Sequence, residues 1–149
     1  MRLYLDTSVI GGFYDSEFHE WTKPLIEDVL RGKHIAIISD ITIKEIQDAP
    51  RNVVELLDQL IKSYSELVTS NDQTEILAAQ YINEGVLSNK SVEDANHIAL
   101  ATISNVNAVV SWNFKHLVNM DRIRLFNSVN LKYGYGLIDI RSPREITGL

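Results

Sequence analysis

Short apolar runs separated by amphipathic stretches set the pattern of this chain. The runs predict strands near residues 2–6, 34–38, 107–111 and 137–140, and a weaker one near residues 65–68. The stretches between the runs carry apolar residues at helical spacing. Strands that alternate with helices predict an α/β fold, a three-layer α/β/α sandwich around one parallel sheet.

Polar residues, glycine and proline indicate where helices begin and end in the first half. Thr22 followed by Pro24 indicates the start of a helix that Gly32 closes. Ser39 or Asp40 is expected to begin the next helix, because both residue types can cap a helix N-terminus.

The second half carries similar signals. Asp72 and Glu75 predict a capping box for a helix that runs to about Asn83. Residues 113–127 are expected to form one or two helices. Pro143 is expected to begin a short tail.

The composition fits a globular protein and excludes several kinds of site. The chain has 149 residues without an internal repeat or linker, so residues 1–149 are expected to form a single domain. It has no cysteine, which excludes disulfides, thiolate metal sites and cysteine nucleophiles. No apolar run is long enough to cross a bilayer and the first residues lack an export pattern, so we expect a cytoplasmic protein. A net charge of −6 argues against broad non-specific binding to nucleic acid, but it suits an acidic site for a cation.

Four polar residues stand where a parallel sheet places its sites. Asp6 ends the first strand, and Glu45 lies about one turn into the helix after the second. Asp94 lies in the first turn of the helix before the strand near residues 107–111, and Asn113 directly follows that strand. These segments can meet at the carboxyl edge of the sheet, where their oxygen atoms would suit Mg²⁺ or Mn²⁺. In that case the carboxylates should lie within reach of one ion, and their repulsion should raise at least one pKa.

Each of these residues also has a purely structural interpretation. Asp6 and Asn113 are residue types that cap helices. Asp94 lies three residues after Ser91 and can complete a capping box with it. Glu45 can be one more solvated charge on a helix.

The other candidate residues are histidines, hydroxyls and a lysine near these acids. His97 is expected to be packed or to support a neighbouring residue, with substrate contact as the alternative. Lys115 and His116 follow Asn113, so they are candidates for the surface or for phosphate contact. Thr7 and Ser8 are weak candidates as nucleophiles, because no histidine or lysine is placed by sequence to activate them.

Several segments resemble motifs of the PIN-domain ribonucleases, whose small single-domain members are the VapC-type toxins of toxin–antitoxin pairs. The matching segments read LDTSVI at residues 5–10, DANHIA at residues 94–99 and VSWN at residues 110–113, with Glu45 between the first two. Length and the order of strands and helices also match, so the resemblance covers nearly the whole chain. It implies a three-layer α/β/α domain that binds Mg²⁺ or Mn²⁺ through clustered acids and hydrolyses RNA.

Carried over to this sequence, the resemblance assigns Asp6, Glu45 and Asp94 to the acidic cluster. Thr7 matches the hydroxyl that often follows the first aspartate. Asn113 departs from the pattern, because many members have a further aspartate there and an amide brings no charge. We expect Asp6 and Asp94 to be core ligands and Glu45 to be a ligand or the general base. Asn113 would be an outer ligand or a water anchor.

The resemblance also implies an antitoxin partner and a homodimer. An acidic protein needs a local basic surface for RNA, and a groove between two copies would supply one. The candidate basic residues for that groove are Lys44, Arg51, Lys90, Lys115, Arg122 and Arg124.

Two other functions compete with a ribonuclease. The first is a PIN-like domain that binds RNA or protein without cutting, which Asn113 and the acidic charge favour. The second is a phosphoaspartyl enzyme that uses Asp6. Such phosphatases usually carry an aspartate two residues further on, where this chain has Ser8.

Overall fold

A computed structural model describes residues 1–147, and its centre is a five-stranded parallel sheet in the order β3-β2-β1-β4-β5. The strands are β1 (Arg2–Leu5), β2 (Ile35–Ser39), β3 (Ser65–Val68), β4 (Ala108–Val110) and β5 (Ile140–Arg141). Each neighbouring pair is parallel, including β1 with β2. The predicted parallel sheet is therefore confirmed, as is the three-layer α/β/α fold.

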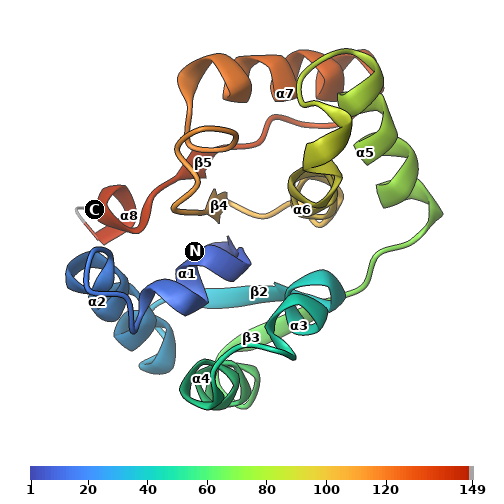
Figure 1. Cartoon of the computed structure of the whole chain (residues 1–149). Helices are drawn as coiled ribbons and strands as arrows, with labels where there is room; N and C mark the ends of the chain where they lie inside the picture. Colours follow the sequence, from blue (N-terminus) through green and yellow to red (C-terminus); the bar gives the residue numbers. More distant parts are fainter. Residues whose placement is uncertain (148–149) are drawn as a thin grey trace.

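Helices fill the connections between the strands (Figure 1). They are α1 (Thr7–Gly12), α2 (His19–Leu30), α3 (Asp40–Ile46), α4 (Arg51–Ile61), α5 (Asp72–Asn83), α6 (Val92–Ile103), α7 (Met120–Lys132) and α8 (Pro143–Thr147), with a 3₁₀ turn η1 (Asn89–Ser91). Within residues 1–147, no helix combines the length and the apolar character needed to cross a bilayer.

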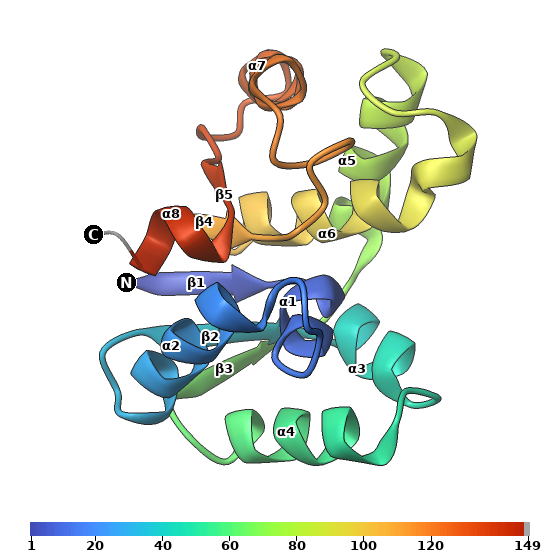
Figure 2. The same ribbon diagram turned by 60° about the vertical axis from the view of Figure 1, so that its left-hand side comes forward.

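Alternation along the strands divides the interior into two cores. In β1, Leu3 and Leu5 face the core that α1, α2, α4 and α8 cover, while Tyr4 faces the core that α5, α6 and α7 cover. Figure 2 shows the sheet between these layers. Helix α3 contacts both cores, because its Ile46 packs in the first and its Ile41 against the second. It directly follows the last residue of β2, so it begins at the sheet's carboxyl edge, the edge where the parallel strands end.

Several element boundaries differ from the sequence-based predictions. Helix α2 begins at His19, three residues before Thr22, and contains Pro24 in its interior. The capping box of α5 is formed by Asn71 and Thr74, so the prediction of Asp72 and Glu75 was wrong by one position.

The C-terminal part differs more. Residues 113–119 form no helix, with a turn at residues 114–117, and α7 begins only after its N-cap Asn119. A strand is predicted near residues 137–140, but residues 137–139 are irregular and β5 consists of Ile140 and Arg141. Pro143 begins helix α8 instead of an irregular tail.

Candidate metal and nucleic-acid site

Asp6 is the buried centre of the carboxyl edge. It follows β1 directly, is 5% exposed, and caps α1 by accepting a hydrogen bond from the Val9 amide. Its Oδ1 also accepts from the Ser8 hydroxyl at 2.6 Å, and its Oδ2 accepts from the Ser111 hydroxyl. Burial raises the pKa of Asp6, and the two serine hydrogen bonds offset only part of that rise. A cation beside Asp6 would stabilise its charged form.

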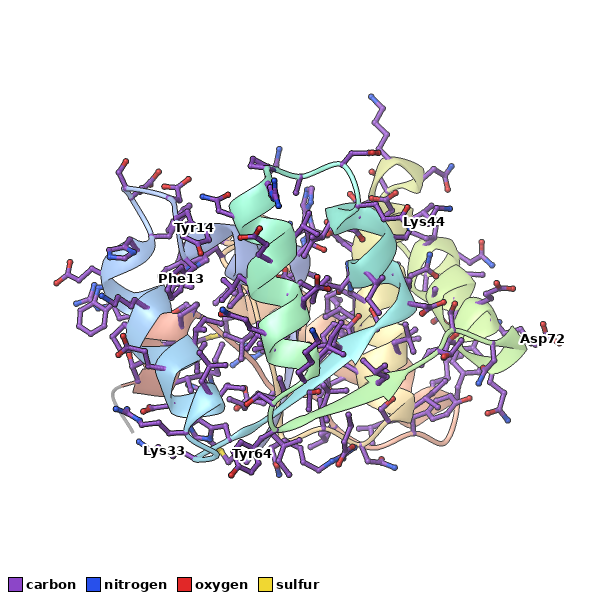
Figure 3. The ribbon with its side chains drawn as sticks, turned by 90° about the horizontal axis from the view of Figure 1, so that it is seen from below. Phe13, Tyr14, Lys33, Lys44, Tyr64 and Asp72 are labelled. Carbon is purple, nitrogen blue, oxygen red and sulfur yellow. The ribbon has the colours of Figure 1, made fainter. Side chains whose placement is uncertain are left out.

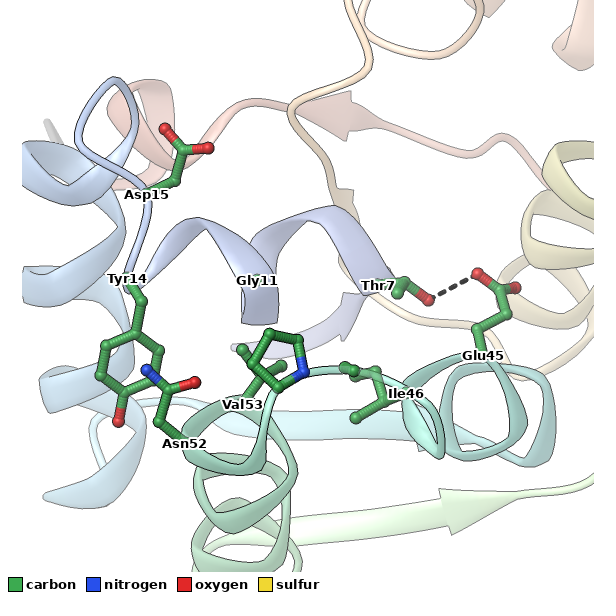
Figure 4. A pocket seen from close by; sticks show the side chains of 10 residues that line it. Thr7, Gly11, Tyr14, Asp15, Glu45, Ile46, Asn52 and Val53 are labelled. Atoms are coloured by element: carbon green, nitrogen blue, oxygen red, sulfur yellow. Dashed lines mark hydrogen bonds between the residues drawn. The ribbon is translucent and has the colours of Figure 1, made fainter.

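Glu45 lies on α3 between two hydrogen-bond donors. Its Oε1 is 2.8 Å from Nε2 of His97, and its Oε2 accepts from the Thr7 hydroxyl at 2.8 Å (Figure 4). Burial by itself raises the pKa of Glu45, but the hydrogen bonds and the charge of His97 outweigh it, so this pKa lies below its usual range. Glu45 therefore stays ionised at neutral pH.

His97 is buried, with 3% of its surface exposed, and both of its ring nitrogens make hydrogen bonds. Its Nδ1 lies 2.6 Å from the Tyr4 hydroxyl oxygen, and Tyr4 donates its one proton to Ser39. Tyr4 must then accept a proton from Nδ1, while the Glu45 carboxylate accepts one from Nε2. This arrangement favours the protonated imidazolium form of His97. Burial lowers the pKa of His97, but Glu45 reverses that effect and holds the pKa above its usual value.

Asp94 lies in the first turn of α6. Its Oδ2 accepts from the Asn113 amide at 3.3 Å and lies 3.2 Å from Nδ1 of His116. Asn113 Oδ1 also accepts from the His116 backbone amide, so the turn after β4 is folded around Asp94. The alternative that Asp94 only completes a capping box with Ser91 is wrong, because the Ser91 side chain makes no cap hydrogen bond.

Hydrogen bonds join Asp6 to Asp94 through the turn after β4. The Ser111 hydroxyl donates to Asp6 and accepts from the Asn113 backbone amide at 3.0 Å. Asn113 then contacts Asp94 through its side chain. Asn113 caps no α-helix, since the next one begins at Met120 with Asn119 as its cap.

The oxygen ligands at this edge fit Mg²⁺ or Mn²⁺ by chemical type, since carboxylate, amide and hydroxyl oxygens are hard donors. Their carboxylates already accept hydrogen bonds, and among residues 1–147 no three acidic or histidine side chains converge on a point that could hold an ion. An ion would therefore compete with the hydroxyl protons of Thr7, Ser8 and Ser111. The expected rise of a pKa is present at Asp6, but burial causes it instead of repulsion between carboxylates.

The basic side chains are spread over several surfaces. Arg51 pairs with Glu55, and the guanidinium of Arg122 donates to the Val86 carbonyl. Lys115 is exposed in the turn next to Asn113. Lys44 lies on α3, and Figure 3 shows it and Tyr14 at the end of the molecule opposite to Lys33 and Tyr64. Lys44 and Lys115 are thus the candidate phosphate contacts on the elements that form the carboxyl edge.

Sequence reasoning did not find Tyr4 and Ser111. Ser111 directly follows β4, so its place at the carboxyl edge was a usable signal. Tyr4 is the one aromatic residue in an otherwise aliphatic strand core, and its alternation with Leu3 and Leu5 turns it toward α6.

Comparison with known proteins shows the fold of this chain. No family model and no curated protein matches its sequence. VapBC2 from Rickettsia felis, solved with a DNA fragment from its promoter, is similar over 95% of this chain and 98% of that one, with 14% identity and a TM-score of 0.61. VapC20 from Mycobacterium tuberculosis, a sarcin–ricin loop cleaving toxin, is similar over 76% of this chain and 92% of that one, with 14% identity and a TM-score of 0.60.

FitAcB from Neisseria gonorrhoeae is similar over 95% of this chain and 97% of that one, with 12% identity and a TM-score of 0.59. These similarities confirm the PIN-domain fold that the sequence motifs indicated.

Proposed function

We propose that this chain, which has the fold of VapC-type toxins, is a metal-dependent endoribonuclease and the toxin of a toxin–antitoxin pair. One observation carries the proposal: Asp6, Glu45 and Asp94 come from three separate elements to the carboxyl edge of this fold, with Asn113 between two of them. This is the edge where ligands bind in open α/β sheets.

In the proposed reaction, Asp6 and Asp94 would hold a Mg²⁺ or Mn²⁺ ion, and Asn113 anchors Asp94 through a hydrogen bond. The bound ion would lower the pKa of a water molecule and offset charge on the phosphate. Glu45 is a better ligand than base, because His97 keeps its pKa below its usual range and a base works best with a pKa near the working pH. His97 and Thr7 hold both carboxylate oxygens of Glu45 in hydrogen bonds, so an ion that binds Glu45 directly would have to displace one of these donors.

The proposal includes partners as well as chemistry. We propose an antitoxin, sought as a small basic and apolar protein encoded beside this one, because two of the similar structures contain such pairs. We also propose a cytoplasmic homodimer, in which two copies bring basic residues to a shared RNA groove.

The test combines thermal unfolding with RNA cleavage across a Mg²⁺ and Mn²⁺ titration. The wild type should be stabilised by metal, because a ligand that binds only the native state shifts unfolding by mass action. Asp94→Asn should fold, but it should lose most of the metal-dependent stabilisation and the cleavage. Asn113→Asp should bind metal more tightly and melt at a lower temperature without it, because it adds a charge beside Asp94.

Asp121→Asn is the matched control. Asp121 lies in the first turn of α7 as Asp94 lies in the first turn of α6. The control should respond to metal as the wild type does. If all four proteins respond equally, the acids do not form a metal site and the nuclease proposal fails.

A second candidate is an RNA- or protein-binding domain that does not cut. The pairing of all three carboxylates with donors favours it, as does the uncharged Asn113. In that case the purified protein binds RNA or a partner protein. With Mg²⁺ or Mn²⁺ present, it shows no RNA cleavage that depends on Asp94.

A further inference from the structure

A groove of about 420 Å³ begins at the Thr7–Glu45 hydrogen bond and extends along α1 to Tyr14 and Asp15 (Figure 4). One wall is α1, and the other is the end of α3 with the start of α4. Its lining residues are Thr7, Gly11, Tyr14, Asp15, Glu45, Ile46, Ala49, Pro50, Asn52 and Val53. Because Thr7 and Glu45 belong to both, the groove is continuous with the proposed catalytic edge.

Gly11 keeps this groove open. A Cβ atom placed on Gly11 would meet nothing within 4 Å, whereas one on Gly12 would lie 3.0 Å from the Trp112 indole nitrogen. Gly11 is inside helix α1 with an ordinary backbone conformation, so the backbone does not demand glycine there. The missing side chain leaves space for a ligand.

Two side chains at the groove, Tyr14 and Asn52, can bind a flat ring that carries polar groups at its edge. Tyr14 is 48% exposed, and Phe13 packs edge-on against it with ring centroids 4.8 Å apart, which holds the Tyr14 ring in place. Asn52 is exposed at the start of α4, and its amide offers both a donor and an acceptor. The groove floor is apolar, formed by Ile46 and Val53.

The charge of the groove selects which part of RNA it can hold. Its charged lining residues are Asp15 and Glu45, with no lysine or arginine among the residues that line it. Phosphate is therefore repelled, while an uncharged nucleobase is not. The volume also lies within the range of small-ligand sites, whereas a docked helix needs a longer apolar groove with anchors along several turns.

We propose that this groove binds one base of a single-stranded RNA, stacked on Tyr14 and contacted through its edge by Asn52. Bases of single-stranded RNA are recognised by aromatic stacking and by hydrogen bonds to their edges. The attached phosphate would then lie outside the groove, away from the carboxylates of Asp15 and Glu45. The inference rests on the proposed ribonuclease function and adds a base-binding subsite to it.

The test measures binding without cleavage. A fluorescein-labelled single-stranded RNA of mixed sequence is titrated with full-length protein in EDTA, and its anisotropy is followed. Gly11→Leu fills the groove and should weaken binding by about tenfold or more. Its melting temperature should be unchanged or higher, because glycine is a poor helix former. Gly136→Leu is the control. Gly136 also has open space around it, but it lies in the loop before the first residue of β5, outside the groove.

Tyr14→Ala provides a second variant in case Gly11→Leu folds poorly. It should weaken binding about fivefold or more through lost stacking. Tyr64→Ala is its control, because Tyr64 is also exposed but lies at the other end of the molecule (Figure 3). Both controls should bind RNA as the wild type does.

The outcomes separate this inference from the proposed function. If the wild type cleaves RNA and Asp94→Asn does not, but Gly11→Leu and Tyr14→Ala bind like the wild type, the nuclease stands and the base subsite is wrong. If the wild type does not bind the RNA, the subsite is also wrong. If Gly11→Leu binds RNA normally but no longer binds the co-expressed antitoxin, the groove is a protein site and the inference is overturned.

Discussion

At the scale of single residues, Asp6 is expected to reduce the stability of the metal-free fold. Its pKa is raised by burial, so the folded state holds a proton that the unfolded chain releases. The contribution of Asp6 to stability is therefore complete below its unfolded pKa of about 4 and is lost as the pH rises through the folded pKa. Asn does not ionise, so Asp6→Asn removes this pH-dependent loss of stability. Its side-chain oxygen can still accept the hydrogen bond from the Val9 amide.

We therefore expect Asp6→Asn in EDTA to melt at the same temperature as the wild type, or higher, at pH 7. The difference between the two proteins should shrink as the pH falls toward 4. Thermal unfolding in EDTA from pH 4 to pH 8 measures it. A variant that melts lower at pH 7 and recovers nothing at low pH would show that the carboxylate stabilises the fold.

The sequence predicted where the acids lie but not how they are bonded. The carboxyl edge follows from the alternation of strands and helices along the sequence, which predicts Asp6, Glu45 and Asp94 at one edge of the sheet. The pairing of Glu45 on α3 with His97 on α6 joins residues 52 positions apart in the sequence, and no local pattern encodes that. The hydrogen-bond partners of these acids depend on side-chain rotamers and on the placement of helices, which the spacing of residues in the sequence does not determine.

At the scale of elements, α1 carries two neighbouring glycines with opposite roles. Gly12→Ala should destabilise the fold by about 1–3 kcal/mol, because its Cβ would press on the Trp112 indole and on Thr22, which are hydrogen bonded to each other. Gly11→Ala should instead stabilise the fold by up to about 1 kcal/mol, because alanine favours the helix and meets no neighbour. Urea unfolding of both variants measures the contrast, and equal effects would contradict it.

The same contacts explain why two element boundaries were mispredicted. Helix α2 begins early because the Thr22 hydroxyl donates to Phe18, and Phe18 stacks on Trp112 with ring centroids 4.5 Å apart. Strand β5 begins only at Ile140, because the Asn127 side chain accepts a hydrogen bond from the Ile138 amide and donates one to the Ile138 carbonyl. These backbone groups therefore do not pair with a neighbouring strand. The Phe18–Trp112 stack and the Asn127–Ile138 hydrogen bonds join different elements, so hydrophobic periodicity within one element does not predict them.

At the scale of the whole molecule, a net charge of −6 sets a limit on how RNA can bind. The field of the protein as a whole repels phosphate, so attraction must come from a few lysines close to the site. Lys115 is exposed beside Asn113, and in a homodimer two copies of this turn would contribute. RNA binding should therefore depend on salt less steeply than for a basic nuclease.

Lys115→Glu tests this balance. It should weaken binding to all single-stranded RNAs by a similar factor and lower the slope of log affinity against log salt by about one for each Lys115 that contacts phosphate. Lys33→Glu is the matched control, because Lys33 lies at the far end of the molecule beside Asp28 (Figure 3). Anisotropy titrations at four salt concentrations, with light scattering to establish whether the protein is a dimer, give the slope per copy. Because both substitutions change the net charge equally, an equal loss in the two variants would mean that overall charge governs binding and that Lys115 does not contact RNA at this edge.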